Sequence, residues 1–411
     1  MSDIVVVGAG VSGVHLALLL QQKGIPVTLI SDRSPEQIAG GRLPNSVAHH
    51  AVTIERERSL GVDHWPVEQY GYTCHYHYVG IPDNPLFYRG DFVSPSRAVD
   101  YRLYLPRLIQ DFTDRGGELR IDSIDADGIE ALSQKHDLVV VSSGKATMGE
   151  FFGTRADKSP YSAPQRRLAV GLWSGLTPRE PHGVTLSLSL GHGELIAIPI
   201  LGVNGPATAL LFENIPGGDL EVLASTPAGE DPAAYRQLVL DKLRQHHPTV
   251  FEQVAEADFA LTGPDDVLQG AVTPVMRNDF VEFGDGKIAL AMGDVHNTVD
   301  PVIGQGANSA SYSAQVVADT IAESSEFGAA FGRLVADRRR ERIEAVNDWT
   351  NAMIGLPPAD HIPQLLGAMS QSKPLADEFT QNFNDPVAQW QLLSSPEATF
   401  DWIGRHAPVA S

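Results

Sequence analysis

Three glycines near the start of the chain have the spacing of a turn that binds phosphate groups. Gly8, Gly10 and Gly13 form a GxGxxG motif between an apolar run at 4–7 and a helix-like segment at 14–24. The first glycine permits a tight turn, the second leaves space for a pyrophosphate, and the third lets the helix approach the strand closely. Unpaired N–H groups at the start of the helix would face the phosphates. The motif therefore predicts a bound dinucleotide.

Polar residues follow the second apolar run, at 26–30. A carboxylate at the end of this strand normally binds the ribose hydroxyls of the dinucleotide. Ser31 occupies that place and Asp32 comes one residue later, so either could reach the ribose, and Asp32 is the predicted ligand. Arg33 is either a contact to the adenosine half or a solvated surface charge.

A second loop with a carboxylate appears nearly 300 residues later. The apolar run 288–292 ends at Gly293 and Asp294, where a carboxylate can accept hydrogen bonds from a sugar hydroxyl. In the residues that follow, Pro301 stiffens the loop, Gly304 and Gly306 let the backbone approach a ligand, and a helix starts around Asn308. Backbone N–H groups there suit the electron-rich edge of a flavin. An NAD-dependent enzyme does not need this loop, whereas a protein that binds FAD in an extended conformation must also contact the middle of the FAD molecule.

Bulk properties limit the partners of the chain. It has 411 residues and a formal net charge of −21, which argues against nucleic acid and against an anionic membrane surface. No apolar stretch is long enough to span a bilayer, and the single cysteine, Cys74, fits a reducing cytoplasm, so we expect a cytoplasmic protein. His75 and His77 lack a third ligand at a suitable spacing, and no metal site is expected.

The motifs GAGVSG, Gly293-Asp294 and PVIGQGAN together resemble the FAD-dependent aromatic hydroxylases. The resemblance implies an α/β fold: a Rossmann-like FAD-binding domain, a mostly antiparallel β-sheet substrate domain and C-terminal helices. No second glycine motif for NAD(P)H is present. The family's middle DG motif is replaced by DLVVVSSGKATMG at 137–149, so the reduced flavin is expected from elsewhere.

Several longer segments resemble the oxygenase component of two-component styrene monooxygenases. They read RLPNSVAHHAVT (42–53), EQYGYTCHYHYVG (68–80), SPSRAVDYRLYLP (94–106), GHGELIAIP (191–199) and DEFTQNFNDP (377–386). The resemblance implies that a separate NADH-dependent flavin reductase supplies reduced FAD. The flavin would form a C4a-hydroperoxyflavin with O2 and epoxidise a styrene-like alkene to the (S)-epoxide. It also implies a homodimer.

The resemblance further implies a set of site residues. The segment matching 42–46 lies against the isoalloxazine in the family, which makes Arg42, Asn45 and His49 the candidate catalytic residues; Asn45 can donate a hydrogen bond there without carrying a charge. The candidate substrate pocket contains Val47, Tyr72, His75 and Ser96, which match styrene-type members. Arg97 is assigned to FAD binding, and a plain ion pair is the alternative. Alternation along 71–79 places Tyr72 on one strand face and His75 on the other.

Patterning along the chain predicts how these residues are positioned. The FAD-binding domain is expected to comprise 1–41, 87–154 and 282–322. The substrate domain would take 42–86 and 155–281, where short apolar and alternating runs predict an antiparallel sheet. From residue 323 to 411 the pattern predicts a C-terminal helical segment.

Other functions stay open at this level. An indole monooxygenase would use an equally small and planar substrate. A single-component NAD(P)H-dependent hydroxylase is disfavoured by the missing DG motif. A flavin-dependent halogenase is disfavoured because GELIAIP keeps only the Ile-Pro of that group's signature. A non-catalytic flavin carrier would not need so large a substrate domain.

Overall fold

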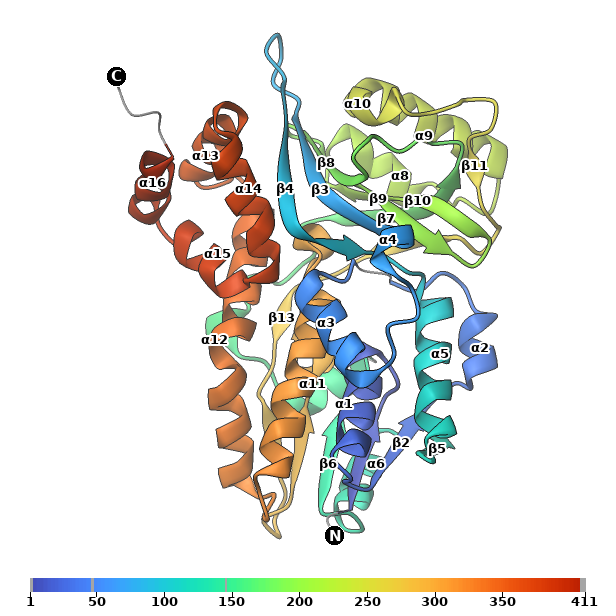
Figure 1. Cartoon of the computed structure of the whole chain (residues 1–411), viewed down its shortest axis with the longest axis vertical. Coiled ribbons are helices and arrows are strands. Elements are labelled where there is room, and N and C mark those ends of the chain that lie inside the picture. Colours follow the sequence, from blue (N-terminus) through green and yellow to red (C-terminus); the bar gives the residue numbers. More distant parts are fainter. Residues whose placement is uncertain (1–2, 46–47, 145, 407–411) are drawn as a thin grey trace.

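The computed structural model describes residues 3–45, 48–144 and 146–406, and a mainly parallel sheet forms its lower half in Figure 1. The strand order is β14-β15-β6-β1-β2-β5, and every pair is parallel except β14 with β15. The strands are β1 (Ile4–Val7), β2 (Val27–Ser31), β5 (Glu118–Ile121), β6 (Leu138–Val141), β14 (Phe280–Glu282) and β15 (Ile288–Ala291). The central strands are buried on both faces, which explains their unbroken apolar sequences.

Helices cover both faces of this sheet. One face carries α1 (Val11–Gln22), α5 (Tyr101–Asp114) and α11 (Gly306–Ala322), whose apolar side chains form one core with β1 and β6. The other face carries α6 (Ala126–Ser133) and α7 (Ala146–Phe152). α1 starts directly after β1, so the glycine turn lies at the carboxyl edge of the sheet.

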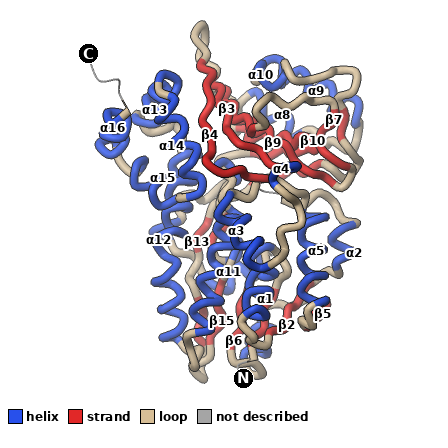
Figure 2. Tube along the Cα trace, in the orientation of Figure 1, coloured by secondary structure: helices blue, strands red, loops and turns tan. Residues whose placement is uncertain are grey.

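A second, eight-stranded sheet lies above the first (Figure 2). Its order is β11-β7-β10-β9-β8-β3-β4, with β12 also paired to β7, and only β3 and β8 run parallel. The strands are β3 (Gly71–Val79), β4 (Leu86–Arg97), β7 (Arg167–Ser174), β8 (Gly183–Ser189), β9 (Gly193–Gly202), β10 (Gly205–Asn214), β11 (Ala260–Leu261) and β12 (Val267–Ala271). One face packs on α8 (Val222–Ser225), α9 (Pro232–His246) and α10 (Pro248–Phe251). The predicted combination of a Rossmann-like sheet with a mostly antiparallel sheet is confirmed.

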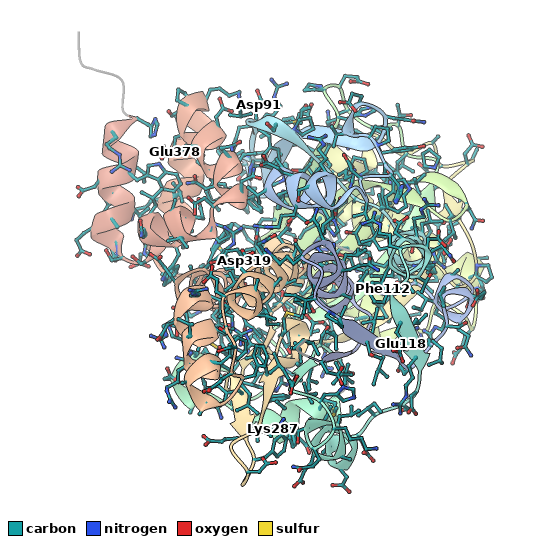
Figure 3. All side chains as sticks on the ribbon, turned by 60° about the horizontal axis from the view of Figure 1, so that its bottom comes forward. Asp91, Phe112, Glu118, Lys287, Asp319 and Glu378 are labelled. Atoms are coloured by element: carbon teal, nitrogen blue, oxygen red, sulfur yellow. The ribbon has the colours of Figure 1, made fainter. Side chains whose placement is uncertain are left out.

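The long helix α12 (Ala329–Ile354) runs from the lower half to the upper half (Figure 1). It leads into α13 (His361–Gln371), α14 (Lys373–Gln381), α15 (Pro386–Leu393) and α16 (Pro396–Arg405). Of these, α13 and α14 pack beside β4, where Lys373 Nζ lies 2.7 Å from an oxygen of Asp91; Figure 3 places Asp91 and Glu378 on this side of the molecule. Their apolar faces share a core with the second sheet.

The pairing of β4 differs from the predicted domain boundary. Residues 87–97 were expected in the FAD-binding domain, but β4 pairs with β3 on both sides of a register shift and belongs to the second sheet. The two strands are consecutive in the sequence, and their hairpin carries β4 into the second sheet together with β3. After β4, the chain returns to the first sheet at α5. The other predicted domain boundaries stay predictions.

Short elements connect these parts. They are α2 (Pro35–Ala39), α3 (Ala51–Leu60), α4 (Val67–Tyr70), the two-stranded pair β13 (Val275–Met276) and β16 (Asn297–Thr298), and the 3-10 turns η1 (Ala156–Lys158), η2 (Asp219–Glu221), η3 (Gly293–Val295), η4 (Pro301–Ile303) and η5 (Asn382–Asn384). In the part of the chain that the structure describes, no helix combines the length and apolar character that crossing a bilayer requires.

Candidate active site

A cleft of about 370 Å³ opens at the carboxyl edge of the parallel sheet. The turn after β1, the ends of β2, β6 and β15, and the start of α11 all contribute to it. Its lining includes Gly8, Gly10, Ser12, Ser31, Asp32, Arg33, Pro44, Asn45, Tyr101, Ser142, Ser143, Gly144, Gly293, Asp294, Gly306 and Ala307. Sheets of this kind bind ligands at this edge.

The glycine turn fits a pyrophosphate. Gly8 has φ +114°, and a Cβ there would lie 2.7 Å from the backbone of Ser142. A Cβ on Gly13 would come within 1.9 Å of the Gly8 carbonyl oxygen, so the helix could not pack as it does. A Cβ on Gly10, by contrast, would meet no atom within 4 Å and would project into the open cleft. Gly10 is also the N-cap of α1 and supplies no side-chain cap, which leaves the first N–H groups of the helix for an anion.

The carboxylates predicted to bind sugar hydroxyls both line the cleft. Asp32 lies beside Arg33, with 3.8 Å between their closest charged atoms, and Asp294 follows β15. Arg277, which the sequence did not single out, donates from Nη1 to the carbonyl oxygens of Asp294 (3.1 Å) and Val295 (3.4 Å). The residues present therefore fit an extended dinucleotide that has one sugar at each end of the cleft.

A smaller cavity of about 40 Å³ lies between the cleft and the second sheet. Its walls come mainly from β3, β8, β9, β10, η4 and η5. They consist of Ala48, His50, Tyr72, His75, Val184, Leu186, Ile196, Ile198, Leu211, Pro301, Val302, Ile303, Gly304 and Phe383. Most of these side chains are apolar, so the cavity suits a compact apolar ligand.

Two chain segments border both spaces. In the first, Pro44 and Asn45 line the cleft and His50 lines the cavity. In the second, Pro301 and Gly304 line the cavity while Gly306 lines the cleft. These segments form the wall across which a bound dinucleotide and a bound apolar ligand would face each other.

The polar groups of the small cavity are neutral. His50 Nδ1 lies 2.9 Å from Ser96 Oγ, and Ser96 also hydrogen-bonds Tyr72. Burial lowers the pKa of His50 to about 3 and that of His75 well below its usual value. Burial also raises the pKa of Tyr72. The described lining of the cavity therefore presents no charge near pH 7 and no group acidic enough to protonate a bound ligand.

The backbone of the β3–β4 hairpin brings Tyr72 and His75 together. The register shifts between Tyr72, opposite Ser96, and Cys74, opposite Asp91. This irregularity breaks the alternation, and the two rings lie 6.1 Å apart in a stacked arrangement on the same cavity. The prediction that they occupy opposite strand faces is wrong for this reason.

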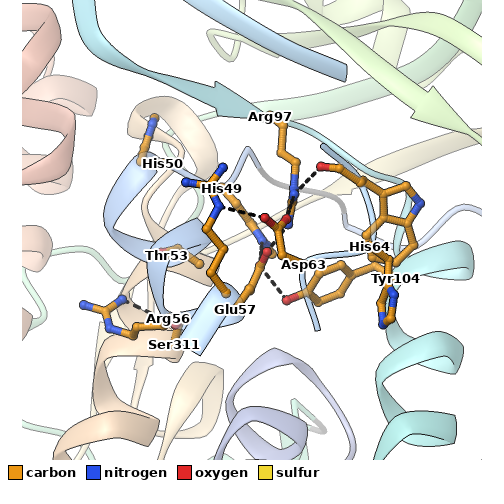
Figure 4. Close-up of polar contacts among 12 residues, drawn as sticks. His49, His50, Thr53, Arg56, Glu57, Asp63, His64, Arg97, Tyr104 and Ser311 are labelled. Carbon is orange, nitrogen blue, oxygen red and sulfur yellow. Dashed lines mark hydrogen bonds and ion pairs between the residues drawn. The ribbon is translucent and has the colours of Figure 1, made fainter. Parts of the chain in front are cut away.

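His49 and Arg97 belong to a buried polar network behind the cleft (Figure 4). The guanidinium of Arg97 pairs with Glu57 and Asp63 and donates to the carbonyl oxygen of Trp65. His49 Nδ1 lies 2.6 Å from Glu57, and its Nε2 lies 3.1 Å from the hydroxyl of Tyr101. Neither side chain lines the cleft or the cavity, because these partners hold both in the network.

Glu57 is the charged centre of this network. Burial alone would raise its pKa, but His49 and Arg97 oppose burial, and the net result is a pKa lowered to about 2. Tyr104 adds a donor at 2.7 Å. An ionised, fully buried carboxylate therefore fixes His49, which in turn contacts Tyr101 in the cleft.

Two relatives decide the family. The chain is 45% identical to styrene monooxygenase StyA of Pseudomonas fluorescens over 409 residues, covering 98% of each chain, and a protein from Pseudomonas sp with the same name matches equally well. The chain belongs to the styrene monooxygenase family. Residues 144–253 also match the family model described as the styrene monooxygenase A putative substrate binding domain. The resemblance inferred from the sequence is confirmed, and the chain is an FAD-dependent monooxygenase.

Solved structures share the fold at low identity. The flavin-dependent brominase Bmp2 aligns with a TM-score of 0.68 and 17% identity, covering 99% of this chain and 100% of the brominase. PqsL, a probable FAD-dependent monooxygenase from Pseudomonas aeruginosa, aligns with a TM-score of 0.59 and 17% identity over 96% of this chain and 100% of its own. At this identity the likeness shows the fold alone.

Two further candidate residues, Arg42 and Asn308, do not line the cleft of this styrene monooxygenase fold. Arg42 is exposed and lines neither space. Asn308 is fully buried, and its amide joins the two bordering segments rather than facing the cleft. Val47 lies outside the described residues, while Asn45 and Ser96 hold the positions described above.

The sequence missed several residues of the small cavity. His50, rather than its neighbour His49, faces the cavity. Phe383 comes from the C-terminal region and packs edge-on against His75, with ring centroids 4.6 Å apart. The sequence shows the dipeptide His49-His50 and the aromatic Phe383, but long-range packing decides which of these side chains reaches the cavity.

Proposed function

We propose that the chain takes reduced FAD from a separate NADH-dependent flavin reductase and uses O2 to epoxidise a small aromatic alkene such as styrene. The overall reaction is alkene plus O2 plus reduced FAD giving epoxide, water and oxidised FAD. The (S)-epoxide and a homodimer, which the family resemblance implies, stay predictions.

One observation carries this proposal: a small, neutral, apolar cavity shares its wall with a cleft shaped for a dinucleotide. A charged or hydroxylated substrate would lose its water in such a cavity without compensating partners. A planar aromatic hydrocarbon has no hydrogen bonds to water to give up, and it gains contact with the rings of His75 and Phe383.

The chain's own residues would hold and orient the reactants. The start of α1 and Gly10 would bind the pyrophosphate, Asp32 the ribose hydroxyls and Asp294 the ribityl chain. Reduced FAD supplies, together with O2, an electrophilic oxygen atom for transfer to the alkene. Asn45 would donate a neutral hydrogen bond at the cleft wall.

Epoxidation by this route needs no acid or base acting on the alkene. The cavity contributes by positioning the double bond and excluding water. The neutral forms of His50 and His75 also preserve the product, because an imidazolium at that place would promote opening of the epoxide ring.

A reconstitution assay tests the proposal. Purified protein is mixed with photoreduced FAD, air and styrene, and the products are resolved by chiral chromatography. Epoxide is expected without reductase or NADH in the mixture. Flavin bleaching by NADH alone would instead favour a self-sufficient hydroxylase, and chloride-dependent products would favour a halogenase. A parallel arm with indole compares the two candidate substrates.

A further inference from the structure

A buried carboxyl lies opposite another across β9 and β10. Glu213 and Glu194 are direct cross-strand partners, and like charges in this arrangement repel. Arg166 neutralises Glu194 through two hydrogen bonds of 2.7 and 2.8 Å and donates its remaining bonds to the carbonyl oxygens of Gln165 and Ile354. Glu213 therefore forms no ion pair with a cation among the residues that the structure describes.

Glu213 meets a second carboxyl instead. Both Glu213 and Asp300 are fully buried, and the two carboxyl groups lie close enough to act on each other's pKa. Among the described residues, neither oxygen of Glu213 nor Oδ2 of Asp300 has a hydrogen-bond partner. Ionised carboxylates only accept hydrogen bonds, so these two carboxyl groups can bond to each other only when one of them carries a proton. The other charged groups acting on the pair are Arg166 and Glu194.

The pair lies directly behind the wall of the small cavity. Asp300 Oδ1 accepts from Val302 N at 3.1 Å and so fixes the turn η4, whose residues line the cavity. Leu211, two positions before Glu213 on β10 and hence on the same strand face, lines the cavity from the other side. The contact between the carboxyls thus joins η4 to β10.

We propose that Glu213 and Asp300 share one proton, and that this carboxylic acid–carboxylate bond positions the 301–304 turn between the cofactor cleft and the small cavity. Glu213 and Asp300 act as positioning residues, since neither lines the cleft or the cavity. Losing the proton leaves two facing carboxylates that repel, and the turn loses its attachment to the sheet.

The pH dependence follows from the burial of the pair. Burial raises the pKa of Glu213 well above its usual range, and the negative charge of Asp300 raises it further. A folded-state pKa above the unfolded value gives stability that is complete at low pH and is lost as the pH rises through the folded-state pKa. Both stability and the yield of product per reduced flavin should therefore fall at alkaline pH.

Two variants isolate the shared proton. Glu213→Gln keeps a donor toward Asp300 but cannot ionise, and Asp300→Asn keeps the acceptor for Val302 N while donating to Glu213. The matched control is Glu344→Gln, which changes a partly exposed carboxylate paired with Arg155 and Lys158, away from both spaces.

Infrared spectroscopy of the full chain at neutral pH gives the direct readout. The wild type minus Glu213→Gln difference should contain the carbonyl stretch of a protonated carboxylic acid. The same band should be lost in Asp300→Asn and retained in Glu344→Gln. Absence of the band from both difference spectra would overturn the proposal. If one variant fails to fold, the other decides the result.

The pH profiles give a second readout. Denaturation midpoints, and epoxide formed per reduced FAD, are compared from about pH 6 to about pH 9. The alkaline decline should be present in the wild type and in Glu344→Gln, and lost in Glu213→Gln. A decline that persists unchanged in Glu213→Gln would contradict the assignment. The infrared and unfolding results need no turnover, so they stand even if the wild type forms no epoxide and the proposed function fails.

Discussion

Replacing Asn308 by alanine should loosen the wall between the cofactor cleft and the small cavity. The Asn308 amide is fully buried at the start of α11. Its Oδ1 accepts from His50 N (3.0 Å) and from the hydroxyl of Thr53 (2.8 Å). Its Nδ2 donates to the carbonyl oxygens of Ala48 (2.9 Å) and Gly304 (3.1 Å). One side chain thus joins both segments that border the two spaces.

The expected loss of stability follows from the buried polar groups that Asn308→Ala leaves without a hydrogen-bond partner. Each net hydrogen bond contributes about 1 kcal/mol, and a buried polar group left without a partner costs about 1–3 kcal/mol. The hydroxyl of Thr53 can rotate to another acceptor, whereas the N–H of His50 and the two carbonyl groups cannot move. We therefore expect a loss of about 3 kcal/mol in the free energy of unfolding, measured from the denaturant midpoint.

A coupling assay separates this role from plain destabilisation. With reduced FAD, O2 and styrene, Asn308→Ala should release more H2O2 and form less epoxide than the wild type, because the wall no longer holds its spacing. Asn347→Ala is the matched control, since Asn347 is equally buried on α12 and donates to Lys158 O at 2.9 Å, but lines neither space. It should lose stability with coupling intact. Equal uncoupling in the two variants, or a loss below about 1 kcal/mol for Asn308→Ala, would refute the reasoning.

Three other variants test separate parts of the site. Asn45→Ala should lower the epoxide yield per reduced FAD and raise H2O2 while flavin affinity is kept, because Asn45 is a neutral donor at the cleft wall; an equal yield would defeat this assignment. Gly10→Val should abolish FAD retention, since its side chain would fill the space open for the pyrophosphate, and unchanged affinity in equilibrium binding would count against that role. Glu57 has its pKa lowered from 4.5 to about 2, so its stabilisation is complete above pH 4.5 and is lost as the pH falls to about 2. Glu57→Gln should remove about 3 kcal/mol of acid dependence from the unfolding free energy, and an acid-unfolding curve parallel to the wild type would contradict this.

Local signals were enough to predict the cofactor half of the molecule. The roles of Gly8, Gly10 and Gly13 depend on the turn itself, and Asp294 follows its strand directly, so each position could be inferred from its neighbours in the sequence. Fold class and the positions of the cleft residues depend on such short-range patterns. The same patterns gave no indication of Arg277, whose contacts with the Asp294 segment come from the short connection between β13 and β14 rather than from the strand that Asp294 follows.

The small cavity depends on contacts that no local pattern specifies. An extra stretch of β4 at the hairpin irregularity decides that Tyr72 and His75 share one cavity. The choice between His49 and His50 depends on Glu57, which holds the first ring in the buried network. Phe383 reaches the cavity only because the C-terminal helices pack beside β4.

Ionised groups around the small cavity lie one layer behind its lining. The Arg97–Glu57 pair lies behind the segment that carries His50, and the Arg166–Glu194 pair lies beside the carboxyl pair behind η4. A charge in the lining itself would retain water, which promotes loss of the activated oxygen as H2O2, whereas the same charge one layer back can still fix the wall through hydrogen bonds. Fully satisfied buried polar groups are costly to assemble but rigid once formed. The arrangement therefore reconciles a dry reaction space with walls that keep a fixed spacing.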